Sequence, residues 1–430
     1  MNLYSTSNKA NIVDLKEAVF KSLPMDKGLY MPCEIPTLPK NVIEDIKNYT
    51  FLELGYEICK NLFQGKIPEK DLKEIVEQAI TFPAPLVHLH DHQYILELFH
   101  GPSLAFKDFG ARFMAQLMSY FLQEEKKQLT ILVATSGDTG GAVAAGFYQT
   151  PGIEVIILYP SGKVSDLQEK QLTTLGKNIT ALEIDGNFDD CQAIVKQAFL
   201  DNDLNKQYNL SSANSINIAR LIPQSFYYFE AYKQLQDHSL PTVFCVPSGN
   251  FGNLTAGLLA KKMGLPIHQF IAATNLNKVI PDYLATGEYK PKASLPTISN
   301  AMDVGKPSNF ARMVDLHKCS PWNNMQKEII GTHCDDEKTR KIMKQIYKKH
   351  EYVICPHTAV GYYAAQQYKN EANVITLATA HPSKFINIVE EEIEAKVDIP
   401  ERLAILKNKK KESVELNNQF EGFKNWMQKR

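Results

Sequence analysis

From about Leu129 onward, short β-branched runs alternate with longer amphipathic stretches. The short runs have the length of buried strands, and the amphipathic stretches place apolar side chains along one helix face. Phe109, Phe113, Leu117 and Phe121, for example, recur at every fourth position. Units that alternate in this way favour an α/β fold, in which helices cover both faces of parallel sheets.

Each predicted strand is a short apolar run that ends in a turn, and most are followed by a predicted helix. The predicted strands are Thr130–Thr135, Glu154–Tyr159, Ile179–Ile184, Thr242–Val246, Gln269–Thr274, Tyr352–Ile354 and Val374–Ala378. The predicted helices are Asp108–Glu124, Ser165–Leu175, Asp189–Leu200, Ile216–Leu235, Leu254–Met263, Thr358–Tyr368 and Ser383–Ala395.

The pattern also divides the chain into regions. Residues 1–95 predict several helices and a proline-rich end, so we expect a mainly helical N-terminal domain there. We expect residues 96–110 and 211–400 to form a large α/β domain, and residues 111–210 a smaller one. Within the large domain, the stretch 278–324 is rich in Pro, Ser and Asn and predicts surface loops. The basic run 407–411 predicts a solvated linker within a C-terminal tail of residues 401–430.

Composition narrows the class of protein. The 430 residues carry a formal net charge of -1, which gives no reason to expect a nucleic-acid or anionic-membrane partner. No segment has the apolar length of a membrane span, and the N-terminus lacks the pattern of a signal peptide. The seven cysteines are scattered without metal-ligand spacing, so we expect buried thiols in a reducing compartment, no metal site and a cytoplasmic location.

Lys107 is the first candidate for chemistry. It lies between Phe106 and Phe109 in a run of apolar residues and glycine. Desolvation disfavours the charged ammonium and lowers its pKa, which leaves an amine that can attack a carbonyl. A lysine that forms a Schiff base with pyridoxal phosphate (PLP) needs this property. The alternative is a surface lysine whose stem lies along an apolar patch.

Two loops predict an anion-binding crevice. Residues 248–253 (Ser-Gly-Asn-Phe-Gly-Asn) follow a predicted strand and open a helix, so their N–H groups can surround a phosphate. Residues 135–141 (Thr-Ser-Gly-Asp-Thr-Gly-Gly) occupy the same position after another strand, and suit a carboxylate or a phosphate. The carboxyl ends of parallel strands meet at one crevice, where open α/β folds bind ligands. Each loop alone is equally typical of a plain helix start.

Further polar residues follow other strands. Arg220 comes three residues after Asn217 in a polar series that starts at 209, so both could face one anion. A surface arginine behind a helix cap is the alternative. Thr379 ends the last predicted strand and would face the crevice or cap the next helix. The histidines have no partner that the sequence identifies, so a structural role is favoured for His100, His357 and His381.

Several of these motifs together resemble the threonine synthase family. The run 99–108 (Phe-His-Gly-Pro-Ser-Leu-Ala-Phe-Lys-Asp), residues 136–140, the series 211–220, residues 248–253 and Thr-Ala-His-Pro at 379–382 occur in that family's order. Gly-Leu-Tyr-Met-Pro at 28–32 also resembles its opening. The likeness extends to about residue 400 and is strongest to the branch without the plant-type N-terminal regulatory extension.

The resemblance implies a role for each motif. It implies a fold-type-II PLP enzyme, similar to the tryptophan synthase β-subunit, in which Lys107 forms the Schiff base and Thr379 bonds the pyridine nitrogen. The cofactor phosphate would be held by Gly249, Asn250, Phe251 and Asn253. The substrate carboxylate or the ring hydroxyl would lie near Ser136, Asp138 and Thr139. The substrate phosphate would be held by Asn214, Ser215, Asn217 and Arg220.

The implied reaction converts O-phospho-L-homoserine and water into L-threonine and phosphate, the last step of threonine biosynthesis. Lys107 would move protons at the substrate carbons, and residues 111–210 would close over the site. The branch suggests a monomer, with a dimer as the alternative. Two other functions stay open: an eliminase of the same fold, either a phospholyase or a threonine dehydratase, and a cofactor-binding protein that has lost catalysis. The 214–220 series disfavours the dehydratase, whose substrate carries no phosphate.

Overall fold

The computed structural model describes residues 1–123, 128–368 and 371–430. Its largest sheet has six strands in the order β12-β11-β10-β13-β5-β4, and only β4 runs antiparallel to its neighbour. The strands are β4 (Leu86–His90), β5 (Gln93–Glu97), β10 (Thr242–Pro247), β11 (Gln269–Thr274), β12 (Ile329–His333) and β13 (Asn373–Ala378). The order changes direction around β10 and β13, so their carboxyl ends border a crevice.

Helices cover both faces of this sheet because successive strand residues point in opposite directions. On β10, Val243 and Cys245 pack toward α17, whereas Phe244 and Val246 join the core that contains α11 and α12. The helices of this part are α10 (Ile218–Leu221), α11 (Phe226–Gln234), α12 (Gly252–Lys262), α13 (Val279–Thr286), α14 (Phe310–Leu316), α15 (Pro321–Glu328), α16 (Asp336–His350), α17 (Pro356–Gln366) and α18 (Ile386–Ile393), with 3-10 turns η2 (Ile222–Ser225), η3 (Asn300–Met302) and η4 (Pro382–Phe385).

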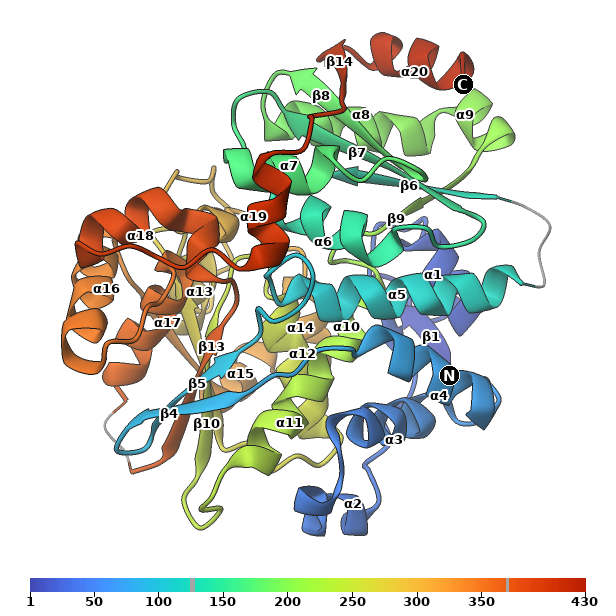
Figure 1. The fold of residues 1–430 in the computed structure, drawn as a ribbon. Helices are drawn as coiled ribbons and strands as arrows, with labels where there is room; N and C mark the ends of the chain where they lie inside the picture. Colours follow the sequence, from blue (N-terminus) through green and yellow to red (C-terminus); the bar gives the residue numbers. More distant parts are fainter. Residues whose placement is uncertain (124–127, 369–370) are drawn as a thin grey trace.

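A second, wholly parallel sheet lies at the top of Figure 1, in the order β14-β8-β7-β6-β9. Here too the side chains alternate: Leu132 packs with α8 and α20, and Ile131 with α5. The strands are β6 (Leu129–Ala134), β7 (Ile153–Pro160), β8 (Ile179–Asp185), β9 (Asn209–Ser212) and β14 (Val414–Asn417). The helices are α5 (Lys107–Leu122), α6 (Asp138–Phe147), α7 (Asp166–Thr173), α8 (Phe188–Leu200), α9 (Asn202–Gln207), α19 (Glu401–Lys407) and α20 (Phe420–Gln428).

The N-terminal region contains a small antiparallel sheet besides its helices. Its strands are β1 (Asn2–Ser5), β2 (Ile12–Asp14) and β3 (Tyr30–Pro32), in the order β2-β1-β3. The helices are α1 (Leu15–Lys21), α2 (Lys40–Glu44), α3 (Phe51–Phe63) and α4 (Glu69–Ala79), with the turn η1 (Ile46–Asn48). In Figure 1, α3 and α4 lie against α5 and α11, and their apolar faces belong to the main core.

Six of the seven predicted strands are confirmed, and one prediction is wrong. Tyr352–Ile354 forms no strand; it connects α16 to α17, and the Tyr352 hydroxyl donates to Glu97. The strands that the sequence did not predict include β12, whose half-exposed Ile-Ile-Gly-Thr-His sequence fits an edge position and has no strong apolar pattern. The stretch 278–324 is not only loop, since it contains α13 and α14 and the start of α15. The predicted helix end at Glu124 lies outside the described residues.

The C-terminal residues are part of the second sheet and not a separate tail. β14 pairs in parallel with β8, and α20 buries Phe423 and Met427 beside α8. The basic run is also less free than predicted, because Lys411 forms ion pairs with Glu169 and Glu183. These contacts add residues 401–430 to the smaller α/β unit that was expected at residues 111–210.

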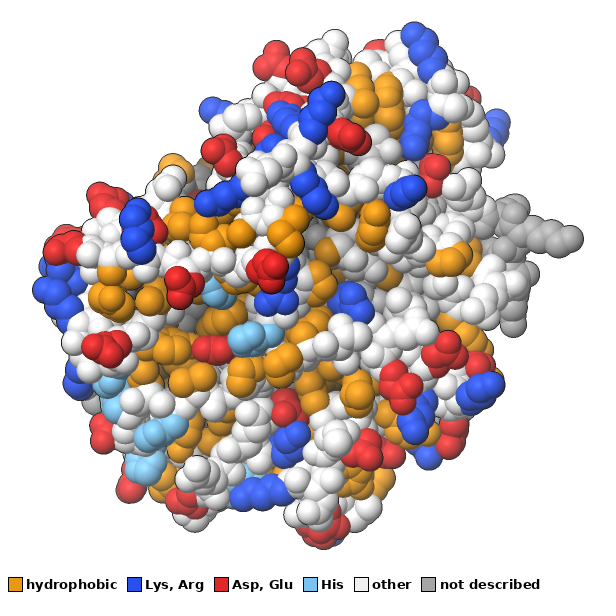
Figure 2. Space-filling view, in the orientation of Figure 1, with side chains coloured by type: hydrophobic (Ala, Val, Ile, Leu, Met, Phe, Trp, Pro, Cys, Tyr) orange, Lys and Arg blue, Asp and Glu red, His pale blue; other side chains and the backbone are white. Residues whose placement is uncertain are grey.

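Figure 2 shows acidic and basic side chains interspersed over one face, with histidines gathered near the β4–β5 hairpin and α16. Two of them, His90 and His350, stack with their ring centroids 4.8 Å apart. Among the described residues, no helix is long and apolar enough to cross a membrane.

Candidate active site

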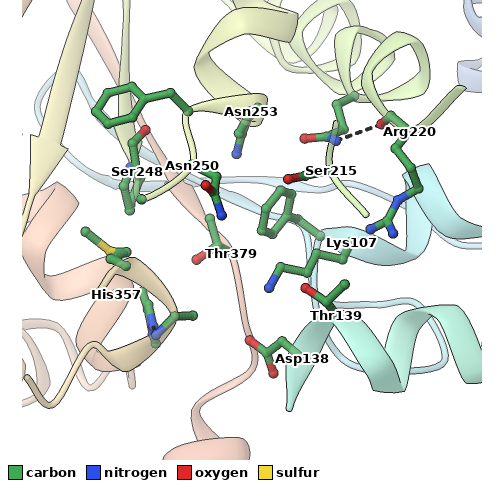
Figure 3. A pocket seen from close by; sticks show the side chains of 18 residues that line it. Lys107, Asp138, Thr139, Ser215, Arg220, Ser248, Asn250, Asn253, His357 and Thr379 are labelled. Atoms are coloured by element: carbon green, nitrogen blue, oxygen red, sulfur yellow. Dashed lines mark hydrogen bonds between the residues drawn. The ribbon is translucent and has the colours of Figure 1, made fainter. Parts of the chain in front are cut away.

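The predicted crevice is a pocket at the carboxyl ends of strands from both sheets (Figure 3). Two of the loops named from the sequence, one from each sheet, meet there, although more than 100 residues separate them. The lining residues are Phe106, Lys107, Asp138, Thr139, Ser215, Arg220, Gln224, Pro247, Ser248, Gly249, Asn250, Phe251, Gly252, Asn253, Ala301, Met302, His357 and Thr379.

Lys107 is the first residue of α5, and its side chain reaches into the pocket (Figure 3). The loop before it is fixed to the strand end at β13, because the N–H of Phe106 donates to the carbonyl of Thr379 at 2.9 Å. Burial lowers the pKa of Lys107 to about 8, and the charges of Lys384 and Arg220 act in the same direction, against Asp138. A substantial fraction of the amine is therefore unprotonated near neutral pH.

The loop 248–253 has the geometry that an anion cradle needs, with a different residue making the turn than the glycines. The left-handed residue is Phe251 (φ 59°), which directly precedes α12. Within the described chain, the N–H groups from Gly249 to Leu254 have no acceptor. They lie at the positive end of a helix, where an anion is favoured. Gly249 is required for steric reasons and not for the turn. Any larger residue would place its Cβ only 2.9 Å from the Cα of Met302.

Asn253 adds a side-chain donor to this cradle. Its Oδ1 accepts from the hydroxyls of Tyr227 at 2.7 Å and Tyr228 at 2.8 Å, which fixes the amide orientation. The Nδ2 group is buried and has no acceptor among the described residues. A buried donor without a partner is costly, so it indicates a ligand with an acceptor at this position.

Arg220 is a buried cation on the opposite side of the pocket (Figure 3). It is 2% exposed, and its guanidinium donates to the carbonyl of Ala213. Its Nε has no acceptor and it forms no ion pair with any described residue. Burial lowers its pKa to about 10, so it stays charged at neutral pH. Asp108 acts on it only at a distance, so a buried cation with an unpartnered donor lines the pocket, which indicates an anionic ligand group.

Asp138 has a partner that the sequence did not indicate. Its Oδ1 lies 2.6 Å from the ammonium of Lys384, and it accepts a hydrogen bond from Gln168 at 2.9 Å. The charges of Lys384 and Lys107 outweigh burial and hold the pKa of Asp138 well below its usual range. Asp138 is therefore a carboxylate, and it would repel a carboxylate of the substrate.

The other predicted site residues divide into two groups. Thr139, Ser215 and Thr379 line the pocket, as do all four predicted residues of the 249–253 cradle. Ser136, Asn214 and Asn217 do not line it. Asn217 is fully buried and caps α10, and its side-chain amide donates to the carbonyl of Val19. Its position therefore supports the fold around Arg220.

Sequence reasoning did not name four lining residues, Gln224, Pro247, Ala301 and Met302. It also gave His357 only a structural role, although this buried imidazole lines the pocket. Its Nε2 accepts from the N–H of Ala301 at 3.2 Å, and burial lowers its pKa to about 4. Gln224 could have been found, since it follows Arg220 by one helical turn. His100 and His381 lie outside the pocket lining, where His100 pairs with Glu97 and His381 caps η4.

These features fit a cofactor that carries both an aldehyde and a phosphate. Lys107 provides an amine of lowered pKa, and the cradle with its unpartnered Asn253 donor provides a phosphate site. Thr379 places a hydroxyl between the two. PLP has this combination of groups, and Lys107, Thr379 and the 249–253 cradle are the residues that would hold it.

Comparison with known proteins agrees with this geometry. The family described as "Pyridoxal-phosphate dependent enzyme" matches residues 79–380, "Threonine synthase N terminus" matches 2–80, and "Threonine synthase, C-terminal" matches 358–427. Threonine synthase of Escherichia coli K12 is 45% identical over 94% of both chains, and that of Saccharomyces cerevisiae is 36% identical over 89% of this chain and 87% of its own.

Solved structures show the same relationship. The crystal structure of Escherichia coli threonine synthase matches with a TM-score of 0.93 and 44% identity over the whole of both chains. The structure of PLP-bound threonine synthase from Brucella melitensis matches with a TM-score of 0.95 and 33% identity, over 100% of this chain and 99% of that one. The chain therefore belongs to the threonine synthase family, the PLP-dependent lyases that serve threonine biosynthesis.

Proposed function

We propose that the substrate is O-phospho-L-homoserine, which the protein converts with water into L-threonine and phosphate. The observation that carries this proposal is the buried Arg220 guanidinium on the far side of the pocket from the cofactor cradle, whose Nε has no acceptor in the described chain. A pocket with two separate anion sites suits a phosphorylated substrate bound beside a phosphorylated cofactor. Ser215, which also lines this side, would contribute a hydroxyl to the substrate phosphate.

The start of α6 would hold the substrate carboxylate. The N–H groups of Gly137 and Gly140 donate to Thr135 Oγ1 at 3.0 and 2.8 Å, whereas those of Asp138 and Thr139 have no acceptor in the described chain. These free N–H groups and the Thr139 hydroxyl can bind a carboxylate at the positive end of the helix. The Asp138 side chain is charged, so we assign it another role than carboxylate binding.

Lys107 would carry the protons. When bound, PLP supplies an electron sink for the bonds that are broken at the substrate carbons. The Lys107 amine, with its pKa near 8, can take a proton from the α-carbon and return one later in the reaction. Arg220 would keep its positive charge beside the phosphate as that group leaves, because its pKa stays above neutral pH.

The smaller α/β unit would close over the substrate. The carboxylate site belongs to α6 of the second sheet, and the cofactor cradle belongs to β10 and α12 of the first. Movement of residues 111–210, together with the C-terminal strand and helix attached to them, would bring the two halves together. Closure would exclude water until the addition step.

Incubation of the PLP-loaded protein with O-phospho-L-homoserine tests the proposal, with phosphate and amino-acid products measured together. We expect phosphate and threonine in equal amounts. Phosphate with 2-oxobutyrate would instead show an eliminase, and no phosphate release would show that this compound is not the substrate. L-homoserine is the matched control, because it lacks the group that Arg220 would bind.

A further inference from the structure

Lys384 is a buried lysine that lies behind the pocket wall. It belongs to η4, just after β13, and its side chain is 1% exposed. Its ammonium lies 2.6 Å from Asp138 Oδ1 and donates to the carbonyl of Ser103 at 2.8 Å. A buried ammonium is retained only where such partners satisfy it.

These two contacts connect three loops of the active site. Asp138 opens α6 of the second sheet, Ser103 lies in the loop that leads to Lys107, and Lys384 follows Thr379 by five residues. Gln171 of α7 donates to the same Ser103 carbonyl at 3.1 Å. The ion pair therefore joins the carboxylate-binding half of the pocket to the cofactor-binding half.

The orientation of Asp138 follows from this arrangement. Its Oδ1 is taken by Lys384 and Gln168, while the residue still lines the pocket. In Figure 3 the carboxylate of Asp138 lies on the Lys107 side of the pocket, with one oxygen turned toward the amine. The charges of both lysines therefore act on one carboxylate, Lys384 through a direct ion pair and Lys107 from within the pocket.

We propose that Lys384 is a positioning residue: it holds the Asp138 carboxylate charged and fixed beside Lys107, and so balances the charge that Lys107 meets when it gains or loses a proton. With Lys384 in place, Asp138 is shared between two ammonium groups. Without Lys384, the carboxylate would pair with Lys107 alone and favour its protonated form. Without the Asp138 charge, Lys107 would face only cations and lose its proton more easily.

Other charged groups near this pair act on all variants alike. The titratable groups that act on Lys107 or Asp138 from the surrounding elements are Arg220 on α10, His357 on α17 and the Cys355 thiol just before α17. Asp108 on α5 acts instead on Lys384 and Arg220. Arg220 and the two lysines supply positive charge, His357 is neutral, and Asp108 is a fully buried carboxyl whose Oδ2 accepts from the N–H of Ser103 at 2.9 Å. Only Lys384 and Asp138 are altered in the experiment.

The test measures the protonation of Lys107 directly, without catalysis. The full chain, freed of cofactor, is treated with formaldehyde and cyanoborohydride at pH values on both sides of 8, and dimethylation of the Lys107 peptide is quantified by mass spectrometry. Because only the unprotonated amine reacts, the pH midpoint follows its pKa. Lys384→Met should raise this midpoint by about one pH unit, and Asp138→Asn should lower it by a similar amount.

Three further variants complete the test. Lys384→Arg should restore the wild-type midpoint, and the double variant Asp138→Asn with Lys384→Met should fall between the two single ones. Lys233→Met removes another partly buried ion pair, with Glu230 at 2.6 Å, and should leave the midpoint unchanged. A Lys384→Met protein with lowered thermal stability but the wild-type midpoint would overturn the proposal. If that variant does not fold, an unshifted midpoint in Asp138→Asn would overturn it equally.

Discussion

In the proposed function, Arg220 is the residue that would most directly distinguish a phosphorylated substrate. Arg220→Met removes a buried charge that lines the pocket, while the methionine keeps most of the side-chain volume. The lost charge-assisted hydrogen bonds correspond to about 1.5–3 kcal/mol. We therefore expect the KM for O-phospho-L-homoserine to rise by about 10- to 100-fold, while PLP retention changes little. Steady-state kinetics and a PLP titration measure the two effects separately.

A matched control is available on α5. Arg112 donates to the carbonyls of Gln78 and Ala79 and lies outside the pocket lining. Arg112→Met should therefore leave the KM unchanged. If Arg220→Met weakened PLP binding and substrate binding by equal factors, Arg220 would belong to the cofactor site.

Asn253 depends on two tyrosines for its orientation, which gives a second test of a single residue. Tyr227→Phe removes the hydroxyl that donates to Asn253 Oδ1 at 2.7 Å, and leaves the buried ring in place. The loss of one such bond corresponds to about 0.5–1.5 kcal/mol. We expect the Kd for PLP, measured by fluorescence titration, to rise by about 2- to 10-fold. Tyr232→Phe, on the same helix but outside the pocket, should not change it; equal effects would argue against the role of Asn253.

The sequence identified Lys107, Thr379 and the 249–253 cradle because each stands in a local pattern that has a chemical meaning on its own. Lys384 could not be found in this way. Its importance depends on a contact with Asp138, which is 246 residues away in the chain. For the same reason Asp138 could be named as a site residue but not given its charge state. Contacts between residues that are far apart in the sequence, and the burial that these contacts cause, can be known only from the folded structure.

The C-terminal strand and helix show the same limit for whole elements. β14 is mostly exposed and its Val-Glu-Leu-Asn sequence has little strand character, so only its pairing with β8 defines it. The central strands β6, β7, β10, β11 and β13 were predictable because burial on both faces demands continuous apolar runs. Edge strands are exposed on one side and carry no such signal.

Phe423 tests whether this C-terminal unit stabilises the second sheet. The side chain is fully buried in the cluster with Ile194 and Leu182. Phe423→Ala should therefore cost about 3–5 kcal/mol of unfolding free energy, and lower the melting temperature measured by calorimetry. Asn425→Ala changes an exposed position of the same helix and should have little effect. A Phe423→Ala protein as stable as wild type would show that residues 401–430 are a dispensable tail.

The stability of the whole cofactor-free protein should fall as the pH decreases from 7 to 5. Burial lowers the pKa of His357 and of His381 to about 4, so below pH 6.5 the unfolded chain binds protons that the folded chain does not. Each imidazole thereby lowers the unfolding free energy by about 2 kcal/mol at pH 5. Asp108 acts in the opposite direction. Burial raises its pKa to about 6, so at pH 5 the folded chain binds a proton that the unfolded chain does not. This proton adds about 1 kcal/mol to the unfolding free energy relative to pH 7.

These three groups together therefore lower the unfolding free energy by about 2 kcal/mol between pH 7 and pH 5, and urea denaturation of wild type and variants at the two pH values can measure their contribution. His381→Gln removes one of the two buried imidazoles without altering the pocket lining, so most of the net loss should disappear in this variant. His268→Gln, at an exposed position, should retain the full loss. A His381→Gln protein with the wild-type difference would show that His381 does not remain neutral in the folded chain.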